Sequence, residues 1–92
     1  MAIRLTKKRV EEPAKTFNLD NYLRDHTSDM LVSVYSGGER KVYSAIYTTK
    51  MGYEVDLISE EKGLLETRPF HTSTESEVNK WADDWSEGKI NE

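Results

Sequence analysis

Glycine-containing turns divide residues 30–70 into four runs of strand-forming residues. The turns are Gly37-Gly38, Lys50-Met51-Gly52 and Glu60-Glu61-Lys62-Gly63, and the runs between them are rich in β-branched and aromatic side chains. Connections this short join antiparallel neighbours, because parallel strands need a crossover of about a dozen residues or more. The spacing therefore predicts a four-stranded antiparallel meander, with strands over 30–35, 41–48, 53–58 and 64–70.

The Gly37-Gly38 pair predicts the register of the first hairpin. A two-residue turn needs positive φ angles, which glycine adopts at little steric cost. Such a turn sets Ser36 opposite Glu39 and Val32 opposite Tyr43. The more apolar face, which we assign to the core, then carries Met30, Val32, Val34, Tyr43, Ala45 and Tyr47.

Gly63 and Pro69 indicate how the second hairpin is built. A three-residue loop ending at Gly63 in the left-handed region sets Asp56 opposite Arg68, whereas a five-residue loop sets Asp56 opposite Glu66. Because opposed like charges are unfavourable, we expect the shorter loop. Pro69 has no N–H to donate to a ladder, which predicts that its strand lies at an edge of the sheet.

Helical periodicity flanks the strands on both sides. Asn18 can cap a short helix from Leu19 to about His26, in which apolar positions recur at helical spacing. Thr74 and Glu77 form the sequence signature of a capping box at the start of a helix over 75–87. The fold class predicted is therefore α+β, with the C-terminal amphipathic helix packed on one face of the sheet through Val78, Trp81, Ala82 and Trp85.

Residues 1–16 differ from the rest of the 92-residue chain in charge and pattern. They carry five basic residues against two acidic ones, within a chain whose net charge is −4. Pro13 and the lack of a sustained period predict a flexible basic arm over 1–16, followed by a single domain over 17–92. A basic arm of this kind attracts acidic partners, although a solvated tail is the commoner use of such a segment.

Composition limits the compartment and the chemistry. The chain has no cysteine, which excludes a disulfide framework, a thiolate nucleophile and a zinc site of the cysteine type. No apolar run reaches the roughly 18 residues that span a bilayer, and the first residues lack the apolar stretch of a signal peptide. We therefore expect a cytoplasmic protein without a membrane association.

The residues able to support catalysis or metal binding are few. His26 lies beside Thr27, Ser28 and Asp29, but neighbours in sequence do not have the geometry of a catalytic triad. Asp25, His26 and Asp29 form a compact group of metal-ligand types, for which a solvated helix end is the simpler interpretation. Five carboxylates in the third and fourth strands and their turn could supply a glycosidase-type pair, but a solvated strand face and turn is the simpler interpretation. They are Glu54, Asp56, Glu60, Glu61 and Glu66. We therefore expect no enzyme activity, no cofactor and no metal site.

Tyrosines on consecutive strands, with cations near the strand ends, form the candidate binding surface. Aromatic rings flanked by Lys and Arg bind single-stranded nucleic acid, because bases stack on the rings and phosphates meet the cations. The same tyrosines at alternate strand positions are ordinary for a core or an oligomer interface. The candidate surface consists of Tyr35, Arg40, Lys41, Tyr43, Tyr47, Lys50 and Arg68.

The order of elements resembles two known families in outline. A basic arm followed by four strands and a helix is similar to the single-stranded DNA-binding coactivators, and a short helix followed by a meander resembles the start of an Sm-like barrel. Neither resemblance involves motif residues, so it implies no site.

The function predicted is a small non-enzymatic binding or assembly module that self-associates. Large apolar residues on the second face of the first hairpin predict a homo-oligomer, held by that face or by the edge strand 64–70. The residues of that second face are Leu31, Tyr35, Val42 and Ile46. A different protein is also a possible partner. The alternative function is single-stranded nucleic-acid binding through the tyrosines and the basic arm.

Overall fold

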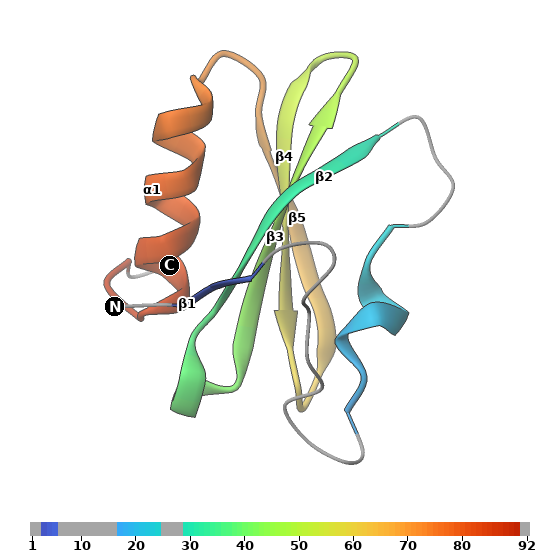
Figure 1. Cartoon of the computed structure of the whole chain (residues 1–92), viewed down its shortest axis with the longest axis vertical. Coiled ribbons are helices and arrows are strands. Elements are labelled where there is room, and N and C mark those ends of the chain that lie inside the picture. Colours follow the sequence, from blue (N-terminus) through green and yellow to red (C-terminus); the bar gives the residue numbers. More distant parts are fainter. Residues whose placement is uncertain (1–2, 6–16, 25–28, 91–92) are drawn as a thin grey trace.

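The computed structural model describes residues 3–5, 17–24 and 29–90, which form an antiparallel sheet with a cover on each face (Figure 1). The sheet has five strands in the order β1-β2-β3-β4-β5, so strand order follows chain order. β2 to β5 are the four predicted strands, and with the C-terminal helix they confirm the predicted α+β fold. The strands are β1 (Ile3–Leu5), β2 (Met30–Ser36), β3 (Val42–Thr49), β4 (Gly52–Ser59) and β5 (Gly63–Phe70).

β1 falls within the segment predicted to be a flexible arm. Ile3 pairs with Ser36 and Leu5 pairs with Val34, so these three residues extend the sheet beyond β2. Ile3–Leu5 therefore lie in the sheet, since the backbone of β2 offers an edge that a short segment can pair with. The flexible arm over 1–16 stays a prediction. Residues 6–16 of the predicted arm lie outside the described residues.

The first hairpin is longer at its turn than predicted. Ser36 pairs with Tyr43 instead of Glu39, and a one-turn 3-10 helix, η2 (Gly38–Arg40), occupies the connection. The connection closes with Lys41 at φ 56, a left-handed conformation that non-glycine residues seldom adopt. The predicted two-residue turn and its register are therefore wrong.

A β-bulge in β2 changes which residues share a face. The register shifts between Leu31 and Ser33, so the strict alternation assumed from the sequence is interrupted there. Leu31 packs with Val34 on one side of the sheet, whereas Val32 packs against the cluster on the other side. The predicted core face is therefore correct for Val34, Tyr43, Ala45 and Tyr47 but wrong for Val32, which lies on the other face, and for Met30, which is exposed.

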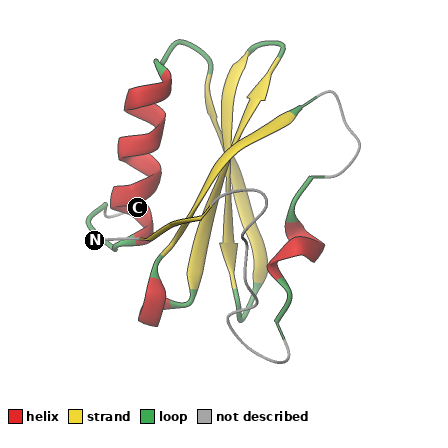
Figure 2. Ribbon diagram, viewed as in Figure 1, coloured by secondary structure: helices red, strands yellow, loops and turns green. Residues whose placement is uncertain are grey.

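Both faces of the sheet are covered (Figure 2). The helix α1 (Glu75–Ser86) lies along one face, where the buried cluster contains Tyr35, Ile46, Val55, Leu57, Val78 and Ala82. The segment 17–24, which includes the 3-10 helix η1 (Leu19–Tyr22), lies on the other face. There the buried cluster contains Phe17, Leu19, Val34, Tyr43, Ala45, Tyr47 and Ile58. The second face that the sequence left open for an oligomer contact is therefore buried under α1, with Tyr35 and Ile46 beneath the helix.

The predicted capping box starts α1. The Glu77 N–H donates to Thr74 Oγ1 at 3.2 Å, and the Thr74 N–H donates to Glu77 Oε1 at 2.8 Å. Val78 and Ala82 are buried, while Trp81 and Trp85 are partly buried against the same cluster. At the far end of α1 the Arg40 Nε donates to the carbonyl of Ser86 at 3.1 Å, which satisfies one of the carbonyls left open at a helix end.

The second hairpin has the expected turn and a different register. Gly63 has φ 78 in the left-handed region and pairs with Ser59, as a bulged hairpin requires. A register shift beside Leu57 and Ile58 then sets Asp56 opposite Thr67, so the predicted Asp56–Arg68 pair is wrong. β5 is the outermost strand, so the edge position predicted from Pro69 is correct.

No helix in the described part of the chain is long and apolar enough to cross a membrane.

Candidate functional site: the edge of β5 and the arginine network behind it

Arg24 lies at the end of the segment 17–24, which covers the face of the sheet opposite α1. Of the predicted helix from Leu19 to about His26, Leu19–Tyr22 form the single turn of η1, and the chain becomes extended at Leu23, with φ −84 and ψ 144. The end of that predicted helix lies outside the described residues. This change of direction lets the Arg24 N–H donate to Tyr47 Oη at 2.8 Å. The Arg24 guanidinium then lies over the Tyr47 ring, 4.5 Å from its centre.

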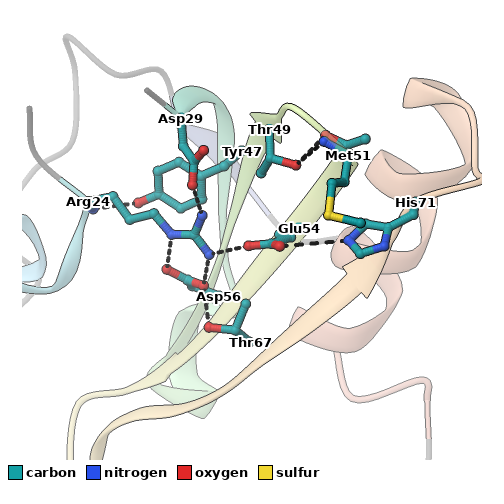
Figure 3. A network of polar contacts seen from close by, with 10 residues as sticks. Arg24, Asp29, Tyr47, Thr49, Met51, Glu54, Asp56, Thr67 and His71 are labelled. Carbon is teal, nitrogen blue, oxygen red and sulfur yellow. Dashed lines mark hydrogen bonds and ion pairs between the residues drawn. The ribbon is translucent and has the colours of Figure 1, made fainter. Parts of the chain in front are cut away.

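Three carboxylates surround the Arg24 guanidinium (Figure 3). Its Nε and Nη2 bond the two oxygens of Asp56 at 3.2 and 2.9 Å, Nη2 also bonds Glu54 at 2.8 Å, and Nη1 bonds Asp29. Burial tends to lower the pKa of Arg24, but the hydrogen bonds to Asp56, Glu54 and Asp29 outweigh it and raise the pKa above its ordinary value. Arg24 therefore stays positively charged throughout the physiological pH range.

Asp56 connects this network to β5. Its side chain is only 4% exposed, and it accepts a hydrogen bond from Thr67 Oγ1 at 2.7 Å in addition to those from Arg24. Glu54 has a second neighbour in His71, whose Nε2 lies 3.7 Å from its carboxylate. The expectation that Asp56 lies on a solvated strand face is wrong, because Arg24 covers its carboxylate. The sequence contains no signal for this contact.

The network uses the carboxylates that a metal or a catalytic pair would need. Asp29, one of three metal-ligand candidates, bonds Arg24, and the other two, Asp25 and His26, lie outside the described residues. Over the ranges 3–5, 17–24 and 29–90, no group of three or more His, Cys, Asp or Glu residues is placed to hold a metal ion. The arrangement serves to join β4, β5 and the covering segment.

The outer edge of β5 is an exposed part of the sheet. No strand among the described residues pairs with it, and four successive residues, from Leu64 to Thr67, are exposed. Leu64 is 51% exposed and Leu65 44%, so two adjacent apolar side chains lie at the surface. Tyr22 is also exposed and lies against Gly63, so an apolar patch marks this end of the strand.

The other end of β5 carries charge and aromatic rings. Arg68 Nε pairs with Glu66 Oε2 at 3.0 Å, and the Arg68 guanidinium lies 5.4 Å from the centre of the Trp81 ring. Phe70 packs against Trp81 of α1 with ring centres 5.0 Å apart. Glu66, Arg68 and Phe70 therefore lie on the α1 side of the sheet, and Thr67, bonded to Asp56, lies on the other side.

The tyrosines of the predicted binding surface do not form an open platform. Tyr35 is buried under α1 and donates to Asn79 Oδ1, whereas Tyr43 and Tyr47 are buried on the opposite face. Tyr43 donates to Glu60 Oε2 at 2.6 Å and stacks on Phe17. Burial raises the pKa of Tyr47 to about 12, and burial together with Glu60 raises the pKa of Tyr43 above its ordinary value.

The predicted cations are spread over separate parts of the molecule. Arg40 and Lys41, in and after η2, line a surface pocket of about 340 Å³ together with Ser59, Glu60 and Glu61. Lys50 is exposed in the turn between β3 and β4, and Arg68 belongs to β5. With the rings buried and the cations apart, the folded domain does not bring the predicted nucleic-acid surface together.

Comparison with known proteins adds no assignment to this geometry. No family model matches the chain, and neither a curated protein nor a solved structure matches it.

Proposed function

We propose that this chain is a non-enzymatic binding and assembly module that self-associates by pairing β5 of one copy with β5 of another. The observation that carries the proposal is the open eight-residue edge of β5, with Leu64 and Leu65 exposed on it. A strand edge offers a row of unpaired N–H and C=O groups, which pair readily with a second strand. Homodimers with twofold symmetry are the commonest way for a single chain to satisfy such an edge.

The two edges of the sheet differ in a way that supports this choice. On one side, the edge of β2 is paired with β1 over three residues. On the other side, no described strand pairs with the eight-residue edge of β5, whose protection consists of Pro69, the bulge beside Leu57 and Ile58, and the charges of Glu66 and Arg68. The surface for assembly is thus the edge of β5 and not the second sheet face.

The test compares the oligomeric state of the unmodified protein with that of one double and one single lysine variant. We expect the unmodified protein to be a dimer at tens of micromolar in analytical ultracentrifugation. Leu64→Lys combined with Leu65→Lys removes the exposed apolar contact and sets like charges at the interface, which should weaken the dimer by about tenfold or more. Met51→Lys is the matched control, because Met51 is 69% exposed in the turn between β3 and β4, and it should leave the dimer unchanged.

A monomeric mass for the unmodified protein over this concentration range would contradict the proposal. So would a dimer that the Leu64 and Leu65 substitutions leave intact, because its contact would then lie elsewhere on the molecule. Circular dichroism spectra of all variants should match, which separates loss of the contact from loss of the fold.

A further inference from the structure

We infer that the two copies meet in one register, with the twofold axis passing beside Thr67 of each β5. This inference rests on the proposed function and adds to it the identity of the contacts. It follows from the symmetry of antiparallel strands and from the order of charges along β5.

Symmetry limits the registers that are available. A twofold axis that relates two antiparallel neighbouring strands is perpendicular to the sheet, so each face of one copy continues into the same face of the other. Residues set opposite each other across the axis must therefore lie on the same face of their own sheet. In the regular part of β5, from Glu66 to Phe70, this condition is met only when the axis passes beside a residue and not between two residues.

The faces of β5 are known from its pairing with β4. Glu66 pairs with Leu57 and Arg68 pairs with Val55, and both partners belong to the buried cluster under α1. Thr67 pairs with Asp56 and bonds its carboxylate on the opposite face. Glu66 and Arg68 thus lie on one face with Thr67 between them on the other.

Charge then distinguishes the three central registers. An axis beside Glu66 sets this glutamate opposite its own copy, and an axis beside Arg68 does the same for the arginine; both arrangements oppose like charges, which destabilises a strand pair. An axis beside Thr67 sets Glu66 of each copy opposite Arg68 of the other. The two residues already form an ion pair within the chain at 3.0 Å, so their charged groups lie at the same height above the sheet.

The same register also places the apolar residues favourably. Counting outward from Thr67 brings Leu65 of each copy beside Pro69 of the other; beyond Leu65 the bulge in β5 interrupts the count, and Leu64, which pairs with Ile58, lies on the face opposite α1. The hydrogen bond from Thr67 to the buried Asp56 holds the strand in position at the axis. The contact therefore has a charged centre on the α1 face, with Leu65 and Pro69 next to it along the strand.

The absence of cysteine from the chain makes the register directly measurable. Three variants, Glu66→Cys, Thr67→Cys and Arg68→Cys, each introduce one thiol into neighbouring positions of β5. Residues directly opposite in an antiparallel pair have Cα atoms about 4.5–5.5 Å apart, inside the range of about 4.4–6.8 Å that a disulfide spans. Residues displaced by two positions are separated by roughly 7 Å more along the strand and are out of range.

Under mild oxidation we expect Thr67→Cys to form a disulfide-linked dimer and the other two variants to remain largely unlinked on non-reducing gels. Faster linking of Glu66→Cys or Arg68→Cys, or no linking of any variant while the unmodified protein dimerises, would overturn the register but leave self-association in place. A monomeric unmodified protein would overturn the proposed function, and the register with it.

Charge reversal provides an independent measurement. Glu66→Arg and Arg68→Glu should each weaken the dimer by about tenfold, because each sets like charges opposite at two symmetric positions. The double variant exchanges the two charges and should recover the affinity of the unmodified protein. Dimer affinity that is insensitive to the single reversals would overturn the inference.

Discussion

Arg24 joins carboxylates from two parts of the chain and places the N-terminal segment against the sheet. Its main partner, Asp56, is buried, and a buried carboxylate depends on a cation and hydrogen bonds to compensate for the water that it has lost. Thr67 supplies a further hydrogen bond to Asp56, but it carries no charge. The charge of the buried Asp56 is therefore compensated by a single guanidinium among the described residues.

Arg24→Ala should lower the free energy of unfolding by about 3 kcal/mol, because it leaves the charge of Asp56 buried without a cation. Urea denaturation followed by tryptophan fluorescence measures this loss. Asp29→Asn is the control, since the Asp29 side chain lies at the rim of the network and its removal should cost under about 1 kcal/mol. Equal losses for the two variants would show that the burial of Asp56 is not the source of the effect.

Tyr43 and Tyr47 should make the protein sensitive to high pH. Burial raises the pKa of Tyr47 to about 12, and that of Tyr43 is raised in the same direction, so both phenols keep their protons in the folded state when an unfolded chain would lose them. Their contribution to stability is complete below the ordinary tyrosine pKa of about 10 and is lost as pH rises through the folded-state pKa. Melting temperatures should fall between about pH 10 and 12.

The matched comparison for this alkaline loss is Tyr47→Phe, which keeps the ring but has no proton to lose. We expect its melting temperature to fall less steeply with pH than that of the unmodified protein over the same range. Parallel curves for the two proteins would show that Tyr47 does not titrate differently on folding.

At the scale of single elements, local signals were predictable and strand registers were not. The predicted start of α1 was correct because a capping box involves residues only three positions apart. The predicted register of the first hairpin was wrong because its turn uses Lys41 in a left-handed conformation, which no residue propensity indicates. The predicted register of the second hairpin was wrong because a bulge adds one residue to β5. Bulges and unusual turns depend on packing across the sheet, which a local pattern does not contain.

The turn before η2 also makes close contact with the end of α1. A Cβ on Gly37 would lie 2.4 Å from the carbonyl oxygen of Ser86, which is closer than atoms can approach. Gly37→Ala should therefore push the turn and the helix apart and lower the free energy of unfolding by about 2 kcal/mol or more. Thermal denaturation of the variant measures the effect.

Gly38→Ala is the control for this contact. A Cβ there meets nothing within 4 Å, so the cost is limited to the strain of φ 62, about 1 kcal/mol. A loss for Gly37→Ala that is no larger than this value would show that the turn and the helix separate easily.

At the scale of the whole molecule, the sequence predicted the layers but not what covers each one. The expectation of an open sheet face assumed that the segment around Leu19 and α1 could cover only one face between them. Instead each covers a different face, and Arg24 holds the first of them through Asp56, a partner 32 residues away. No spacing rule connects two residues so far apart, so the network and the choice of β5 as the open surface required the structure.

The order of the strands has a consequence for how the chain folds. Each of β2 to β5 pairs with its neighbour in sequence across a short turn, so the loop-closure entropy of each step is small and the sheet can grow by successive hairpins. The two covers require much longer closures, from Arg24 to β4 and from α1 to β3. We therefore expect the hairpins of the sheet to form ahead of the contacts with the two covers during folding.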